Sequence, residues 1–162
     1  MSLLPKAKVA ADGAADGVVT DNEHSGQCHC GAVTYRARGL RDLWYCHCYQ
    51  CRRLTGHVMA ACWTQRDKLD VSGKVVWTPV SEHSSHGFCG NCHSPLFWSN
   101  STRNSISVLG GSLNDSKGIT ACGHLFVSEK GDYYEITDGL PQYARWPDAD
   151  DPNHAAKVAA TE

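Results

Sequence analysis

The sequence lacks a long apolar run. Leu3 and Leu4 are followed at once by Pro5, so the first residues do not form the apolar stretch of a secretory signal. Nothing elsewhere approaches the ~20 consecutive apolar residues that a membrane-spanning helix needs. We therefore expect a cytoplasmic protein with no membrane partner.

Charge of one sign is also missing. Lys and Arg number 15 against 17 Asp and Glu, which gives a formal net charge of -2, and no long Lys/Arg run is present. A chain of this kind has no overall field that would attract nucleic acid or an anionic membrane. We expect no nucleic-acid partner.

Helical periodicity and internal repeats are absent as well, so we expect any helix to be a single turn. Short segments rich in β-branched and aromatic residues are instead separated by Gly, Asn, Asp and Ser. That pattern is typical of an all-β domain. The expected strands are AVTYRAR (32–38), VMAACW (58–63), KVVWT (74–78), ISVLG (106–110), HLFVSE (124–129) and YYEI (133–136).

A chain of 162 residues with 41% hydrophobic content can form one domain with a core. Residues 1–24 and 148–162 are rich in Ala, Gly and Asp without periodicity, so we expect two tails around a domain at 25–147. The domain should be mainly β, with short antiparallel strands, long loops and a thin core. Metal ions that join distant loops would then contribute much of its folding free energy.

Cysteine is the residue that the sequence has in excess, with nine in all. In a reducing compartment such thiols are more often metal ligands or catalytic groups than disulfides. Gly90 suits the tight turn of a zinc knuckle within CGNC, and the βαβ pattern expected around a redox pair is missing. The clustered cysteines are Cys28 and Cys30, then Cys46, Cys48 and Cys51, and finally Cys89 and Cys92.

Seven clustered thiols suggest one site with four ligands and one with three. Spacing does not say whether the first pair joins the last pair or two of the central three. Cys62 and Cys122 lie in apolar surroundings and should be buried as small hydrophobic residues. His29 and His47 lie between cysteines on tight loops, where we expect exposed spacers that do not reach the same ion.

Six motifs occur in the order GQCHCGAVTY, CHCYQCRRLTG, GFCGNCHSPLFW, GSLND, HLFVSE and EITDGLPQY. In this order they resemble the glutathione-dependent formaldehyde-activating enzymes, a family that also includes the centromere protein V group. The resemblance runs from residue 26 to about residue 147 and implies a zinc-stapled β-tent. It further implies two zinc ions, a structural one on Cys28, Cys30, Cys89 and Cys92 and a second in an open catalytic site on Cys46, Cys48 and Cys51.

The activity implied by the resemblance is that of a carbon–sulfur lyase, which forms S-hydroxymethylglutathione from glutathione and formaldehyde. A related thiol and aldehyde are also possible partners. An ion with three thiolates carries a formal charge of -1 and should bind and ionise a thiol more readily than generate hydroxide. Arg52 and Arg53 are candidates for the glutathione carboxylates, and His57 is a surface residue, a proton shuttle or a fourth ligand.

Two other functions fit the same motifs. A non-catalytic zinc-stapled binding module would resemble the centromere-associated relatives, although the near-neutral charge argues against chromatin binding. A thiol redox protein would form a disulfide between Cys46 and Cys51 under mild oxidation.

The chain departs from the family pattern at three places. His57, Val58 and Met59 stand where small residues and then an aromatic one are frequent. His93 stands where glycine is frequent, which predicts a left-handed residue, and Cys122 stands where proline is common. Trp98, His124 and the segment EITDGLP are expected to be packing framework.

Overall fold

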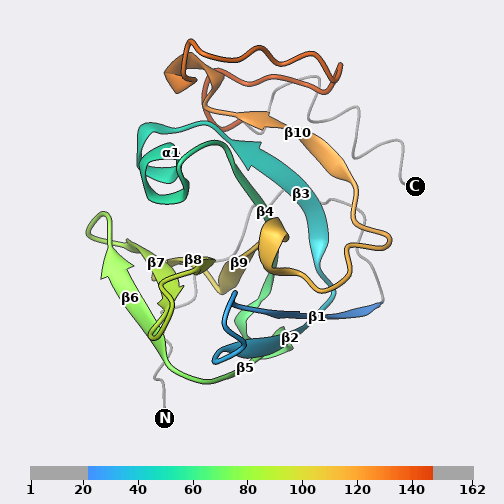
Figure 1. The fold of residues 1–162 in the computed structure, drawn as a ribbon. Helices are drawn as coiled ribbons and strands as arrows, with labels where there is room; N and C mark the ends of the chain where they lie inside the picture. The colour runs from blue at the N-terminus through green and yellow to red at the C-terminus, as the bar shows by residue number, and fades with distance from the viewer. Residues whose placement is uncertain (1–21, 148–162) are drawn as a thin grey trace.

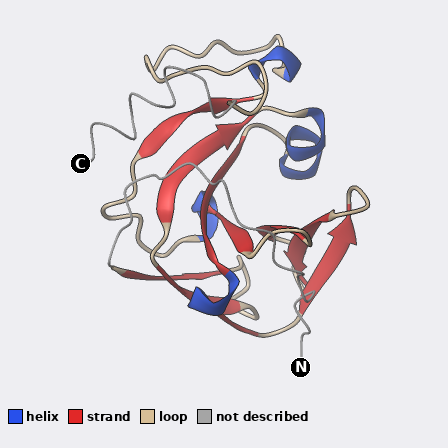
Figure 2. Ribbon diagram, turned by 180° about the vertical axis from the view of Figure 1, so that it is seen from behind, coloured by secondary structure: helices blue, strands red, loops and turns tan. Residues whose placement is uncertain are grey.

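Strands dominate residues 22–147, the part of the chain that this computed structural model describes (Figures 1 and 2). The prediction of a mainly β protein is confirmed. The strands are β1 (Glu23–Gln27), β2 (Thr34–Arg38), β3 (Arg41–Cys46), β4 (Met59–Gln65), β5 (Leu69–Ser72), β6 (Val75–Pro79), β7 (Ser84–Cys89), β8 (Pro95–Asn100), β9 (Ser105–Leu109) and β10 (Ala121–Leu125). The helices are α1 (Tyr49–Thr55) and three short 3₁₀ segments, η1 (Arg66–Lys68), η2 (Gly110–Ser112) and η3 (Val127–Glu129).

The strands form two sheets. The smaller has the order β1-β2-β5, and the larger has the order β10-β3-β4-β9-β8-β7-β6. Among the strands named above, every neighbouring pair is antiparallel, as expected, except β10 and β3, which are parallel. This parallel pair places Leu125 beside Cys46, at the end of β3 where the central cysteine motif begins.

The main core contains residues from both sheets. In β2 buried and exposed side chains alternate, as expected for a strand with one face on the core and one in solvent. The ring of Tyr35 from β2 meets the ring of Phe97 from β8 edge-on, with centroids 5.3 Å apart. Cys62 and Cys122 are both buried, as predicted.

Several local predictions were wrong. The helix α1 has seven residues and is longer than a single turn; it ends at Gly56, whose φ of 84° and N–H bond to the Arg52 carbonyl stop the helix. The predicted strand at 124–129 ends at Leu125, because Phe126 has a φ of 57° and turns the chain into η3. Residues 133–136 form no strand.

The predicted tails lie outside the described residues except for residues 22–24, and β1 begins at Glu23. No helix within residues 22–147 is both long enough and apolar enough to cross a membrane.

Candidate metal and substrate site

Four cysteines from two distant turns meet in one cluster. Cys28 and Cys30 lie in the β1–β2 turn, Cys89 is the last residue of β7, and Cys92 lies in the β7–β8 turn. Their four sulfurs all lie within 4.8 Å of one another, with 3.6 Å between Cys28 and Cys30 and 3.9 Å between Cys30 and Cys89. Zinc held by four thiolates at about 2.3 Å separates its sulfurs by ~3.8 Å, so this donor set fits zinc.

Amide groups around the cluster point at the sulfurs. The Val33 N–H donates to Cys28 Sγ at 3.2 Å, and the N–H groups of Asn91 and Cys92 donate to Cys89 Sγ at 3.4 and 3.5 Å. Such bonds stabilise negative charge on a thiolate and orient it toward a metal ion. The zinc-knuckle geometry expected of CGNC is therefore present.

The residue after this knuckle has a left-handed backbone. His93 has a φ of 60°, and its N–H donates to the Cys89 carbonyl at 3.1 Å. The prediction from the missing glycine is confirmed. A histidine in this conformation is less favourable than glycine, so the knuckle is held in place by its surroundings.

The central motif forms a second cluster of three sulfurs. Cys46 ends β3, Cys48 is the N-cap of α1, and Cys51 lies within the helix; their sulfurs all lie within 4.8 Å of one another. Cys48 Sγ accepts the Cys51 N–H at 3.4 Å. Cys51 is buried in a small hydrophobic cluster with Met59 and Leu109. We refer to these three cysteines as the three-thiol cluster.

The crowding of these sulfurs shifts their acidity in opposite directions. Hydrogen bonds from the thiols of Cys46 and Cys51 lower the pKa of Cys48 far below its usual value. The same contacts raise the pKa of Cys51, and the contact with Cys48 raises that of Cys46. Three thiols this close disfavour one another's ionisation, and a divalent cation would favour the ionised form of all three. The soft donor set fits zinc and leaves a fourth position for another ligand.

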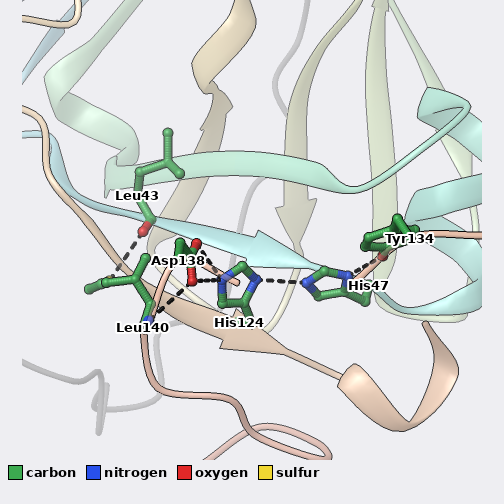
Figure 3. A network of polar contacts seen from close by, with 7 residues as sticks. Leu43, His47, His124, Tyr134, Asp138 and Leu140 are labelled. Atoms are coloured by element: carbon green, nitrogen blue, oxygen red, sulfur yellow. Dashed lines mark hydrogen bonds and ion pairs between the residues drawn. The ribbon is translucent and has the colours of Figure 1, made fainter. Parts of the chain in front are cut away.

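His47, between two of these cysteines, is 1% exposed, so the prediction of an exposed spacer was wrong. His29 is exposed, as predicted. Figure 3 shows the chain of contacts that holds His47. The Nε2 atom of His47 lies 2.9 Å from His124 Nδ1, and the Nδ1 atom of His47 contacts the hydroxyl of Tyr134. His124 Nε2 in turn lies 2.9 Å from an Asp138 oxygen.

The carboxylate of Asp138 decides which atoms donate and which accept in this hydrogen-bond network. The Asp138 carboxylate accepts from His124 Nε2, and in a neutral His124 ring Nδ1 then accepts from His47 Nε2. His47 Nδ1 then accepts from the Tyr134 hydroxyl. Burial lowers the pKa of His47 to about 4, so the His47 ring is neutral at neutral pH.

Sequence reasoning missed this chain because its members are far apart. His47 and His124 are 77 positions apart, and only the parallel pairing of β10 with β3 brings them together. The N–H of His47 also donates to the Leu125 carbonyl at 2.9 Å. These bonds fix the backbone between Cys46 and Cys48 and so fix the spacing of their sulfurs.

The polar residues after the cluster have different surroundings. Arg52 is half-buried, and its buried Nε has no hydrogen-bond partner among the described residues. Arg53 is exposed, with its guanidinium 4.0 Å from the centre of the Tyr49 ring. His57 is exposed, lies 3.3 Å from the Tyr133 hydroxyl and is not among the donors gathered at the three sulfurs.

A hollow of about 650 Å³ is lined by Cys28 of the four-cysteine cluster and by Met59 and Leu109, which pack against Cys51; Cys46, Cys48 and Cys51 are not among its lining residues. Thr55, Met59 and Leu109 line it on the side of the three-thiol cluster, and Cys28 lines it on the side of the four-cysteine cluster. The Thr55 hydroxyl donates to the Cys51 carbonyl at 2.9 Å. The volume is in the usual range for small-molecule sites, and none of its described lining residues is Asp, Glu, Lys or Arg.

One comparison with known proteins identifies a family. A family model described as glutathione-dependent formaldehyde-activating enzyme matches residues 23–129. Among solved structures, the crystal structure of a Rhodobacter sphaeroides protein is similar, with 25% sequence identity, 59% of this chain and 90% of that chain covered, and a TM-score of 0.47. A comparison with curated protein sequences gave no significant match.

Proposed function

Because the chain belongs to the glutathione-dependent formaldehyde-activating enzyme family, we propose that it is a zinc-dependent carbon–sulfur lyase. It joins the thiol of glutathione, or of a related compound, to formaldehyde or a related aldehyde. The observation that carries this proposal is the three-thiol cluster, whose sulfurs lie within 4.8 Å of one another without a fourth His, Cys, Asp or Glu donor among the described residues. A substrate sulfur can take the remaining position.

The residues of the chain divide the work of binding and orientation. Cys46, Cys48 and Cys51 would hold the ion, and the bonds made by His47 keep the first two at a fixed spacing. Zinc, when bound to these thiolates, would favour the ionised form of a substrate thiol beside it. Met59 and Leu109 cover Cys51 and exclude water from that side.

The reaction balances in atoms and electrons. The substrate thiol gives up its proton, its sulfur forms a bond to the carbonyl carbon, and the carbonyl oxygen takes up a proton to become a hydroxyl. No oxidant or further co-reactant is needed.

The four-cysteine cluster is proposed to hold a second, structural ion, because amide groups surround its sulfurs and no ligand position is left.

The direct test is two-dimensional exchange NMR on a mixture of formaldehyde and glutathione, with and without the zinc-loaded protein. We expect the protein to accelerate the exchange between free and adduct signals in proportion to its concentration. If both clusters hold zinc and the exchange rate stays at its uncatalysed value, the lyase proposal is wrong, and the non-catalytic binding module becomes the better hypothesis.

The two neighbouring arginines should differ in their effects on substrate binding. The buried Nε of Arg52 has no hydrogen-bond partner within residues 22–147, and a glutathione carboxylate would supply one. We expect Arg52→Ala to raise the KM for glutathione about tenfold or more, because a hydrogen bond to a charged group contributes about 1.5–3 kcal/mol. Steady-state kinetics measure the change.

Arg53→Ala is the matched control, since Arg53 is exposed and stacks on Tyr49. Its KM should stay within about twofold of the wild-type value. A thiol without carboxylates, such as 2-mercaptoethanol, should show no difference between the wild-type protein and the Arg52→Ala variant. Equal effects of both arginine variants would exclude this role for Arg52.

A further inference from the structure

His86 in β7 is a buried residue that the reaction described so far does not use. Its side chain is 0% exposed, and neither ring nitrogen has a hydrogen-bond partner among the described residues. A neutral imidazole carries one donor and one acceptor, and burying both without partners is unfavourable. Such a group in a folded protein points to a partner that the polypeptide does not supply.

The strand register shows which way the His86 ring faces. His86 pairs with Trp98 in β8, and Trp98 pairs with Ser107 in β9. Directly paired residues point to the same face of a sheet, and residues two apart on a strand do so as well. His86 therefore lies on the same face of the larger sheet as Leu109, two residues after Ser107.

This face is the one that carries the three-thiol cluster. Leu109 and its partner Ala61 in β4 belong to the hydrophobic cluster around Cys51. The helix α1 is also tied to the hairpin that contains His86, because the Gln50 side chain donates to the Val80 carbonyl at 3.1 Å. In Figure 1, α1 lies on the side of β7 that faces β3.

Electrostatics agree with this placement. Burial lowers the pKa of His86, and the charge of the Cys48 thiolate acts on it in the opposite direction. His86 is not among the donors gathered within 4.8 Å of the three sulfurs. A group at this position can contact a molecule bound to the cluster without being a ligand of the ion.

We propose that His86 is a further active-site residue, whose ring N–H donates a hydrogen bond to the carbonyl oxygen of the aldehyde during attack by the thiol. This inference rests on the proposed lyase function. As the sulfur–carbon bond forms, the π electrons of the carbonyl move to oxygen, which takes up the proton released by the thiol. The imidazole stabilises the developing charge and is unchanged at the end.

Two variants separate this role from a structural one. His86→Phe keeps a flat ring but cannot donate, so we expect kcat to fall about 100-fold with little change in the KM for glutathione. Its melting temperature should rise by about 2–4 °C, because two unpaired polar atoms leave the interior. His86→Gln keeps an N–H donor and should recover part of the lost kcat. A loss of kcat together with a lower melting temperature in both variants would overturn the proposal.

A binding experiment gives a second readout that does not depend on turnover. S-(2-hydroxyethyl)glutathione carries a hydroxyl near the sulfur, whereas S-ethylglutathione does not. We expect the first compound to shift the ¹⁵N signals of the His86 ring clearly and the second to leave them nearly unchanged, while both shift the amide signals of residues 46–51.

The outcomes distinguish the two proposals. If both compounds shift the amide signals of residues 46–51 and the His86 ring signals stay in place, the role of His86 is wrong and the lyase function stands. If neither compound binds and the wild-type protein does not accelerate adduct formation, the lyase function fails, and the role of His86 fails with it.

Discussion

Replacing Cys48 with serine should remove the acceleration of adduct formation and leave the domain folded. Cys48 is the N-cap of α1, a position where serine is among the preferred residues, so the helix should still form. A hydroxyl is a poor substitute for a soft thiolate ligand. We expect the catalysed rate to fall by more than about 100-fold, as measured by exchange NMR, while circular dichroism and urea unfolding show a folded protein.

Cys122→Ser is the matched control for this experiment. Cys122 is buried outside both clusters, and its thiol donates to the Leu43 carbonyl at 3.2 Å, a bond that a serine hydroxyl can also make. The control should keep the wild-type rate and bind the same amount of zinc, whereas Cys48→Ser should bind one ion fewer. Wild-type activity in Cys48→Ser would place the reaction elsewhere in the molecule.

Replacing Cys89 with serine should unfold the protein, whereas Cys48→Ser should leave it folded and remove only the catalysed rate. Cys89 is fully buried, pairs with Val75 across the β6–β7 ladder and belongs to the cluster that joins the β1–β2 and β7–β8 turns. Losing a structural zinc removes a large share of the folding free energy of a small domain. We expect a loss of about 4 kcal/mol or more, comparable with the whole stability of many domains of this size.

Urea unfolding and thermal melting measure this effect directly. Serial addition of a chelator to the wild-type protein gives an independent check, because the ion held by three sulfurs should leave before the ion held by four. Activity should then be lost before the protein unfolds. A Cys89→Ser variant that melts with the wild-type protein would show that the four-cysteine cluster is not a structural metal site.

Local spacing explains why the cysteines could be recognised from the sequence. Each cluster is built from tight turns, such as the knuckle between Cys89 and Cys92, whose geometry depends on neighbouring residues alone. The pairing of Cys28 with Cys89 depends on the whole sheet, and spacing left it open. The resemblance to a family supplied that combination, and the structure brings the same four sulfurs together.

The histidines could not be placed in this way. The burial of His47 depends on His124 and Asp138, which reach it only through the parallel pairing of β10 with β3. The sequence could not identify His86 as a candidate site residue, since a lone histidine in a strand belongs to no motif with a recognisable spacing. Its interpretation depends on the register of the larger sheet and on two ring nitrogens that have no partner in the part of the chain that the structure describes.

Strand prediction failed where pairing with a neighbouring strand, rather than local propensity, decides whether a segment forms a strand. Residues 133–136 contain two tyrosines and an isoleucine and have high β-propensity, but no neighbouring strand pairs with them. The segment Glu23–Gln27 has little propensity and still forms β1, because β2 supplies a complete antiparallel partner. Propensity is a weak guide wherever such pairing is settled by distant parts of the chain.

The parallel pairing of β10 with β3 also affects the order in which parts of the domain can fold during synthesis. All four sulfurs of the four-cysteine cluster are available once Cys92 has emerged from the ribosome, well before His124 and Asp138 are made. The loop of Cys46 and Cys48 emerges sooner still, but His124 and Asp138, which brace it, come some 75 to 90 residues later, several seconds at ordinary rates of translation. Cys46 and Cys48 are therefore made before Cys89 and Cys92, but the residues that fix their spacing come later.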